Sequence, residues 1–161
     1  MAAKKELTNA MRILDKQKIE YETISYDCKE FIDGLHAVKQ MGLPEDVFYK
    51  TLVLSGKSKE YYVFVIPVAA EIDLKEAAKV CSEKSVELIP VKDINALTGY
   101  IRGGCTPIGM KKRFKTFIDE SASNLEKIYI SGGRIGSTIG LKPADLIAVT
   151  GASYASLITK N

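Results

Sequence analysis

Two apolar segments joined by a short polar turn constrain the fold of this chain more than any other feature. Residues 47–56, VFYKTLVLSG, and 61–68, YYVFVIPV, are rich in the β-branched and aromatic residues that favour strands. The overlapping stretch SGKSKE between them is typical of a turn. We therefore expect two neighbouring strands here, the clearest pair in the chain.

The remaining segments show helical and strand patterns in an irregular order. Apolar residues at helical spacing and capping residues predict helices over 5–17, 33–42, 73–84, 92–99 and 142–151. Alternating or β-branched patterns predict strands over 19–26, 86–91, 113–120, 127–133 and 137–141, while 152–159 is ambiguous. Strands mostly follow one another through short turns. This order favours an α+β fold with a mixed, largely antiparallel sheet over alternating βαβ units.

The same spacing predicts which helix faces are buried. The expected inward face of the first helix consists of Leu7, Ala10, Met11 and Leu14. The expected inward face of the third helix consists of Leu74, Ala77, Ala78 and Cys81. Two aspartates, Asp33 and Asp73, are expected to cap the second and third helices at their N-termini.

The length and charge of the chain are those of an ordinary globular protein. Its 161 residues predict one domain, residues 1–161. The net charge of +3 is too small to indicate a nucleic-acid partner by itself. No apolar run approaches the ~18 residues of a membrane span, and residues 1–14 lack the apolar stretch of a signal peptide. We therefore expect a cytoplasmic protein with no membrane partner.

Cysteine and histidine are too scarce for several kinds of site. The three cysteines, Cys28, Cys81 and Cys105, form no CxxC pair, and His36 is the single histidine. These residues encode neither a disulfide framework nor a zinc site, and we expect no metal and no cofactor. A nucleophilic pair of Cys105 with His36 remains an alternative, against the simpler view that both are structural residues. A Ser–His–Asp triad would need the same histidine.

Two glycine-rich segments are candidates for a binding site. Residues 98–112, TGYIRGGCTPIGMKK, hold four glycines, too many for a helix or an ordinary strand. A loop of this kind can approach a phosphate or a substrate carbonyl closely. Residues 131–140, SGGRIGSTIG, lack the GxxxxGK[ST] pattern of a phosphate loop. They indicate either a weak nucleotide signal or a turn between two strands.

A lysine lies inside the strongest predicted strand. Lys50 shares one face of that strand with Phe48 and Leu52, so burial of its charge would be costly. Either the side chain extends to solvent at the strand end, or it points into a polar site. In a cleft it would supply a fixed positive charge for a phosphate or a developing oxyanion.

A basic run follows the first glycine segment. Residues 111–115, KKRFK, carry four positive charges in five positions. Two interpretations stay open for this run. It is either a solvated strand face or a patch that binds phosphates beside the site.

The order of four segments resembles one protein family. These segments are VFYKTLV (47–53), VFVIPVAAEIDLKEAAK (63–79), TGYIRGGCTPIGMKK (98–112) and IYISGGRIG (128–136). On them the chain resembles, over nearly its whole length, the YbaK/EbsC family of free-standing bacterial aminoacyl-tRNA deacylases. That family is related to the editing domain inserted in bacterial prolyl-tRNA synthetases. The resemblance implies a mixed, partly barrel-like sheet surrounded by helices. It also implies hydrolysis of mischarged tRNA, above all Cys-tRNA(Pro) and in some members Cys-tRNA(Cys), in a complex with prolyl-tRNA synthetase on the tRNA.

The resemblance also implies site residues, position by position. The family's lysine matches Lys50, which with Gly103 and Gly104 forms the expected catalytic set. The expected substrate-binding set consists of Tyr26, Thr51, Cys105, Thr106, Pro107, Ser131 and Thr138. Within it, Pro107 ends the family's Gly-x-x-x-Pro loop and Ser131 begins its Ser-Gly-Gly turn. Thr138 stands where the family has an acidic residue, and a family aromatic residue aligns near Asp33, with Phe31 close by.

The mechanism implied by the family needs no nucleophile from the protein. The thiol of the substrate cysteine attacks its own ester carbonyl, and water then opens the cyclic thioester. On this reading Lys50 anchors the terminal adenosine or its phosphate, the glycine loop places amides near the carbonyl oxygen, and Cys105 is incidental. The alternatives are a deacylase for Ala- or Ser-tRNA and a non-catalytic module that binds tRNA or a synthetase.

Overall fold

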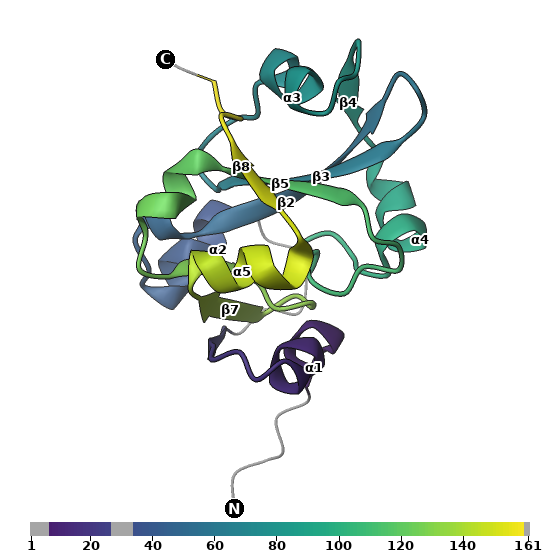
Figure 1. Ribbon diagram of the computed structural model, residues 1–161. Helices are drawn as coiled ribbons and strands as arrows, with labels where there is room; N and C mark the ends of the chain where they lie inside the picture. The colour runs from purple at the N-terminus through teal and green to yellow at the C-terminus, as the bar shows by residue number, and fades with distance from the viewer. Residues whose placement is uncertain (1–6, 27–33, 160–161) are drawn as a thin grey trace, which may run out of the picture.

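The computed structural model describes residues 7–26 and 34–159 of the chain (Figure 1). Its strands are β1 Glu22–Ser25, β2 Tyr49–Gly56, β3 Tyr61–Pro67, β4 Val86–Leu88, β5 Lys115–Asp119, β6 Ile128–Ser131, β7 Ser137–Leu141 and β8 Ser153–Ala155. Its α-helices are α1 Asn9–Lys16, α2 Gly34–Met41, α3 Leu74–Val80, α4 Ile94–Thr98 and α5 Pro143–Thr150. Short 3₁₀ helices are η1 Glu45–Val47, η2 Val91–Asp93 and η3 Glu120–Asn124.

The strands form a larger and a smaller sheet. The larger sheet has the order β4-β2-β3-β5-β8, and the smaller one has the order β1-β7-β6. The β1–β7, β6–β7, β2–β3 and β2–β4 pairings are antiparallel, while β3–β5 and β5–β8 are parallel. The predicted α+β class with a mixed, largely antiparallel sheet is therefore confirmed, and the ambiguous segment 152–159 contains the parallel strand β8.

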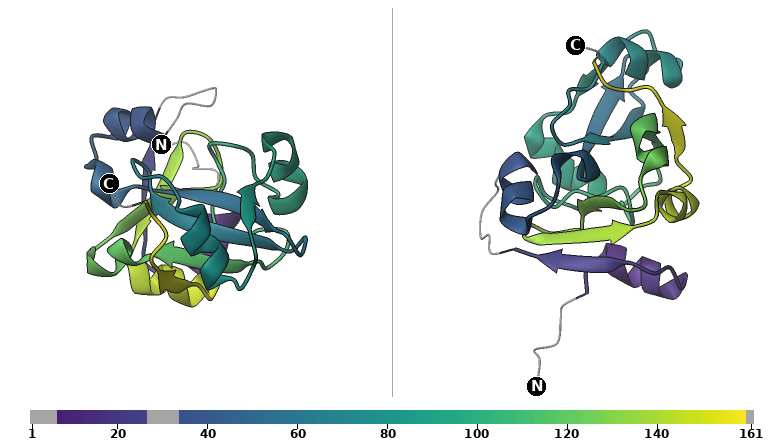
Figure 2. Two further views of the ribbon diagram at one scale, coloured as in Figure 1. Left: turned by 90° about the horizontal axis from the view of Figure 1, so that it is seen from above. Right: turned by 90° about the vertical axis from the view of Figure 1, so that its left-hand side faces the viewer.

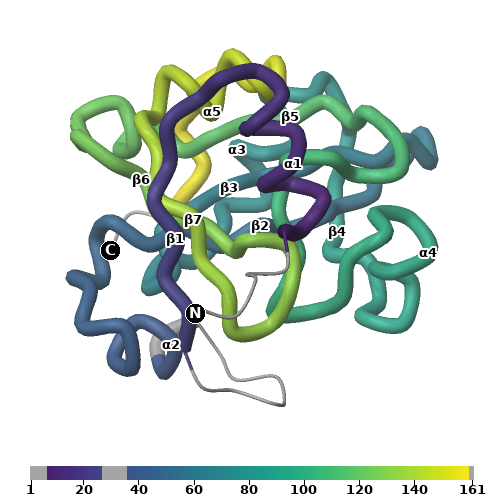
Figure 3. Tube along the Cα trace, turned by 90° about the horizontal axis from the view of Figure 1, so that it is seen from below, coloured from purple at the N-terminus to yellow at the C-terminus, as the bar shows by residue number. Residues whose placement is uncertain are grey.

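The two sheets are joined at one point. Phe48, directly before β2, makes a parallel bridge with Tyr129 of β6. The edge strand of the smaller sheet thus continues alongside the start of β2, which gives the partly barrel-like arrangement. Figure 2 shows β1 and β7 running side by side beneath the larger sheet, and Figure 3 shows them again from below, with α1 at the start of β1.

Three apolar clusters hold these layers together. The largest lies between the sheets and joins Val63 and Ile118 of the larger sheet to Ile130 and Ile139 of the smaller one, with Leu14 of α1. A second cluster packs α3 onto the outer face of the larger sheet, and a third packs α2 against Phe48, Val68 and Tyr129. Each fully buried Ile or Leu side chain contributes roughly 1.5–3 kcal/mol by leaving water.

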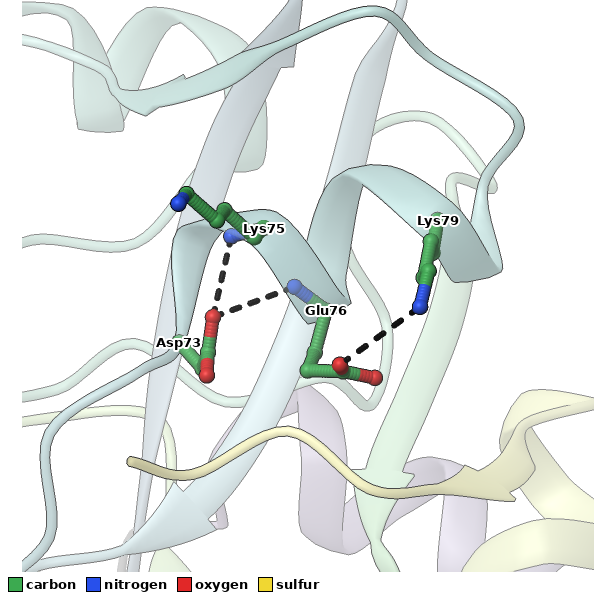
Figure 4. Close-up of polar contacts among 4 residues, drawn as sticks. All are labelled: Asp73, Lys75, Glu76 and Lys79. Atoms are coloured by element: carbon green, nitrogen blue, oxygen red, sulfur yellow. Dashed lines mark hydrogen bonds and ion pairs between the residues drawn. The ribbon is translucent and has the colours of Figure 1, made fainter. Parts of the chain in front are cut away.

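Helix α3 begins at the predicted cap. The Asp73 carboxylate accepts hydrogen bonds from the amides of Lys75 and Glu76, and Lys79 lies 3.9 Å from Glu76 one turn later (Figure 4). These contacts satisfy donors that a helix start leaves open. The second predicted cap, Asp33, lies outside the described residues.

Two expected core positions are wrong. Leu7 is 42% exposed because α1 begins only at Asn9, after the N-cap Thr8, so Leu7 precedes the helical face to which it was assigned. Leu74 is 45% exposed because it occupies the first turn of α3, while Ala77, Ala78 and Cys81 carry the buried contact. Within the described residues, no helix is both long and apolar enough to cross a membrane.

Candidate active site

Lys50 and Ser131 each follow the bridge that joins the two sheets. Phe48 and Tyr129 form an isolated parallel bridge, and Lys50 and Ser131 stand two residues beyond it, each on its own strand. Because side chains alternate along a strand, Lys50 lies on the face of Phe48 and Ser131 on the face of Tyr129. The bridge joins two positions that are 81 residues apart in the chain, and it is the starting point of the candidate site.

The Lys50 side chain is half-buried. Burial lowers the pKa of its ammonium, and the nearby negative charge of Glu71 partly opposes that effect. A lysine in this position is a fixed cation in a partly desolvated place. Such a charge interacts more strongly with an anion than a fully solvated lysine does.

Ser131 connects the two glycine segments. Its hydroxyl donates a 3.4 Å hydrogen bond to the carbonyl of Gly103 and accepts one of 3.4 Å from the amide of Gly133. Both bonds are long, so they leave the hydroxyl able to turn toward a ligand. The Ser-Gly-Gly turn and the Gly103–Pro107 loop therefore lie against each other.

Gly104 makes that contact possible. A Cβ atom at Gly104 would lie 2.7 Å from the Cα of Arg134, closer than real Cβ contacts approach. The amide of Gly104 donates to the carbonyl of Ile101 within the loop's own turn. Gly104 thus packs the loop onto the 132–136 turn, and its amide is already engaged.

Gly103 has a different role in the loop. Its φ of +88° lies in the left-handed region that glycine adopts without strain. Among the described residues, 7–26 and 34–159, the amides of Gly103, Cys105 and Thr106 donate to no backbone carbonyl. These amides are candidate hydrogen-bond donors to a ligand.

Two residues that the sequence analysis missed hold this region in place. The Thr8 hydroxyl bonds to the carbonyl of Gly132 at 2.5 Å and also caps α1 by accepting from the amide of Met11. The buried Tyr100 hydroxyl donates to the carbonyl of Ile108 at 2.5 Å, across the glycine loop. A threonine just before an amphipathic helix is an N-cap signal, so Thr8 was accessible from sequence as a cap. Nothing in the sequence pointed to its contact with Gly132.

The predicted threonines are placed differently from one another. Thr138 of β7 pairs with Ser131 in the sheet register and so belongs to the candidate site. Thr106 is fully buried within the glycine loop, next to the buried Pro107. Thr51 lies on the opposite face of β2 from Lys50, the face of Tyr49 and Val53, so the structure does not bring it together with Lys50.

The same three threonines share an unusual feature. The hydroxyl oxygens of Thr51, Thr106 and Thr138 are buried and have no hydrogen-bond partner among the described residues. Buried hydroxyls without a partner cost free energy, so in a folded protein they suggest a role for a ligand or water. The backbone of Tyr26 lies beside the 132–136 turn, since its amide donates to the carbonyl of Gly136 at 2.9 Å.

Cys105 is not prepared to act as a nucleophile. Burial raises the pKa of its thiol to about 11, and a hydrogen bond with Thr98 only partly offsets this. A thiol with that pKa is almost entirely protonated near neutral pH, and the thiolate is the reactive form. His36, its proposed partner, lies on α2, where it is exposed. The geometry therefore favours the structural interpretation of Cys105.

Comparison with known proteins defines the class to which this fold and site belong. The sequence profile of the aminoacyl-tRNA editing domain matches residues 35–149. The chain belongs to this family, as the four ordered segments indicated.

Particular relatives cover the whole chain. It is 39% identical over 163 residues to "Putative Cys-tRNA(Pro)/Cys-tRNA(Cys) deacylase EbsC" of Enterococcus faecalis (strain ATCC 700802 / V583), covering 99% of each sequence. The crystal structure of "a putative trans-editing enzyme for prolyl tRNA synthetase" superposes with a TM-score of 0.82 at 21% identity, covering 96% of this chain and 100% of that one. A scaffold protein for computational epitope grafting gives a TM-score of 0.83 at 21% identity, over 96% and 100% of the two chains. The two structures establish the fold alone.

Proposed function

We propose that this protein is an aminoacyl-tRNA deacylase that hydrolyses Cys-tRNA(Pro), and also Cys-tRNA(Cys), after release from the synthetase. The observation that carries the proposal is the contact of Ser131 with the Gly103–Pro107 loop, near the bridge between the sheets that Lys50 follows, with a Cys105 thiol whose pKa burial raises. The full-length relative, whose name is that of a Cys-tRNA(Pro)/Cys-tRNA(Cys) deacylase, supports the same substrate. Lys50 supplies a cation and the glycine loop supplies amide donors. A substrate that carries its own nucleophile needs only such binding and charge-stabilising groups from the protein.

The chemistry begins with the substrate. The thiolate sulfur of the esterified cysteine attacks its own carbonyl carbon, a C–S bond forms, and the C–O bond to the terminal ribose breaks. The ribose oxygen leaves with the bonding pair and takes up a proton. Water then opens the cyclic thioester to give free cysteine. A free thiol of pKa ≈ 8.5 is already a few per cent thiolate near neutral pH, so no strong base is needed.

The protein's contribution is position and electrostatics. The amides of Gly103 and Cys105 hydrogen-bond the carbonyl oxygen as negative charge develops on it, which typically accelerates such reactions by 10²–10³ for each donor. Lys50 binds the terminal adenosine or its phosphate. Gly104 holds the loop against the 132–136 turn so that these donors keep their place.

The proposal keeps the full substrate-binding set, although not every member lines the pocket. These residues are Tyr26, Thr51, Cys105, Thr106, Pro107, Ser131 and Thr138. Thr138 offers an unpaired hydroxyl in place of the family's acidic residue. Since Thr51 faces away from Lys50, we propose that it supports the site from the core and does not contact the substrate beside Lys50.

Discrimination then rests on chemistry more than on fit. A pocket distinguishes one methylene by only ~10–200-fold. Serine is a far weaker nucleophile than cysteine and alanine has none, so both esters should react slowly even when they bind.

The proposed setting is the cytoplasm, with tRNA as the polynucleotide partner and prolyl-tRNA synthetase in a complex on the tRNA. The one-domain organisation over residues 1–161 stays a prediction.

The test is a parallel deacylation assay. Wild type and Lys50→Ala are incubated under multiple-turnover conditions with Cys-tRNA(Pro), Ala-tRNA(Pro) and Ser-tRNA(Pro). Fast loss of cysteine alone, abolished by the substitution, is the expected result. Preferential loss of alanine or serine would discard the thiol mechanism while keeping the site. Binding of tRNA without turnover of any ester would identify a binding module instead.

A further inference from the structure

A basic groove lies at the edge of the larger sheet, away from the Lys50 site. It encloses about 380 Å³ and is lined by Val80, Arg113, Phe114, Lys115, Thr116, Phe117, Thr150, Gly151 and Ser153. Arg113 and Lys115 are exposed, and no acidic residue is among the described residues that line the groove. Lys111 and Lys112, also exposed, precede it in the chain. The groove therefore concentrates positive charge in a protein whose net charge is only +3.

Arg113 lies at the C-terminal end of α5. Its guanidinium Nη2 lies 3.0 Å from the position that a Cβ atom would occupy at Gly151, so a side chain at 151 would displace it. Gly151 ends α5 in the left-handed conformation, with φ of +73°. The C-terminal end of a helix carries partial negative charge and attracts a guanidinium. The helix end therefore favours a position of Arg113 at the groove.

The aromatic residues of the groove are already occupied. The Phe114 ring packs edge-on to Tyr61 with centroids 6.0 Å apart, and the Phe117 ring stacks on Phe64 at 5.5 Å. Both rings already contact another aromatic ring, whereas single-stranded nucleic acid is commonly bound by aromatic side chains that are open to the bases. The groove offers charge and a Ser153 hydroxyl at its rim, which suits a phosphate backbone and not a base.

The groove is too far from Lys50 to contact the aminoacyl ester. Lys50 pairs with Ile66 of β3, and Lys115 pairs with Tyr62 of the same strand. Four residues along a strand and two strand spacings separate the two lysines by roughly 16 Å. One RNA molecule reaches both places, but the two sites act on different parts of it.

We propose that this groove binds the sugar-phosphate backbone of the tRNA substrate, independently of its sequence. The proposal rests on the function proposed above for the substrate's identity. Arg113 and Lys115 each neutralise one phosphate, and the displaced counterions make binding fall with salt. The groove therefore sets tRNA affinity, and the Lys50 site sets the rate of the chemical step.

The experiment measures binding of uncharged tRNA(Pro) from 50 to 300 mM salt. The test variant is Arg113→Gln with Lys115→Gln, which removes two charges. The matched control is Lys16→Gln with Lys92→Gln, since both lysines are exposed and neither lines the groove. Losing two phosphate contacts lowers the slope of log affinity against log salt by about 1.4–1.8 and weakens binding at least roughly tenfold at the lowest salt. The control leaves the slope unchanged.

Two further measurements separate the possible failures. Arg113→Lys keeps the charge but loses the guanidinium, so it should retain the wild-type slope. Loss of binding in this variant would make Arg113 a structural cap of α5 and overturn the proposal. An equal loss in the test and control variants would show a net-charge effect, and an unchanged slope in the test variant would also overturn it, leaving an acidic protein surface as the occupant to examine.

Deacylation kinetics keep this test apart from that of the proposed function. For Cys-tRNA(Pro), the double variant should raise KM and leave kcat within about twofold of wild type. If wild type hydrolyses no mischarged tRNA but the salt slope still falls in the variant, the proposed function fails and the groove stands. If wild type is active and the slope does not change, the groove fails and the function stands.

Discussion

Cys105 is a candidate nucleophile in the sequence, because it is a lone cysteine in a glycine-rich loop. The structure instead buries its thiol in a way that opposes ionisation. Burial raises the pKa of its thiol to about 11, so it stays neutral while an unfolded thiol ionises near 8.5. We predict that Cys105→Ala retains at least half of wild-type deacylation of Cys-tRNA(Pro), measured under multiple turnover. A loss of 10²-fold or more, with the fold intact, would make Cys105 the nucleophile.

The same thiol predicts a pH dependence of stability. A group whose folded pKa is raised contributes stability below its unfolded pKa and loses it as pH rises. The Cys105 contribution should therefore decline between about pH 8.5 and about pH 11. Urea unfolding of wild type and Cys105→Ala across that range should show the wild type losing more stability. Parallel curves for the two proteins would rule out a buried thiol.

Lys50 carries the charge that the account needs. We predict that Lys50→Met lowers kcat/KM for Cys-tRNA(Pro) by about 10²–10³-fold, because a partly desolvated cation is removed from the site. Lys39→Met on α2 is the control, since Lys39 is an exposed lysine. Comparable activity of the two variants would show that the Lys50 side chain extends to solvent along the sheet and has no part in the reaction.

At the scale of elements, the site depends on how closely the glycine loop approaches the 132–136 turn. In Gly104→Ala the new methyl would lie 2.7 Å from the Arg134 backbone, so the loop has to move away from Ser131. We predict a loss of at least about tenfold in deacylation, because misplaced donors no longer reach the carbonyl oxygen. The double variant Gly104→Ala with Arg134→Ala should not recover activity, since the clash is with backbone. Recovery of deacylation in the double variant would show that the new methyl clashes with the Arg134 side chain and not with its backbone.

A second connection between elements governs stability and not chemistry. The buried Asp119 carboxylate accepts from the amide of Leu157 at 3.0 Å and from the amide and hydroxyl of Ser121 at 3.2 and 2.6 Å. Ser121 in turn meets the Tyr49 hydroxyl at 2.6 Å. Asp119→Ala should lower the free energy of unfolding by about 2–3 kcal/mol, measured by urea denaturation. Glu120→Ala, an exposed neighbour, should change it by less than about 0.5 kcal/mol.

At the scale of the whole molecule, local sequence patterns predicted the helices and strands. The contacts between segments far apart in the chain could not be predicted from those patterns. The β2–β3 pair and the cap at Asp73 depend on neighbouring residues, so both were predictable. The bridge between Phe48 and Tyr129, which Lys50 and Ser131 each follow by two residues, depends on how two sheets twist and meet. No periodicity encodes such a contact. The glycine loop and Lys50 were candidates from the residues alone, whereas Ser131 was proposed from the resemblance to a family.

In the part of the chain that the structure describes, we find no side chain prepared to act as a nucleophile, so the central claim is that the substrate supplies it. The most direct test compares single-turnover deacylation of Cys-tRNA(Pro), Ser-tRNA(Pro) and S-methylcysteinyl-tRNA(Pro) by the wild-type protein. Serine replaces only the sulfur atom, and methylation blocks it. The account predicts that both replacements slow the reaction by at least about 10³-fold, beyond the ~10–200-fold that a pocket achieves by fit to one methylene. Hydrolysis of the serine and S-methyl esters at rates close to that of the cysteine ester would contradict it, because water or a protein group would then be the nucleophile.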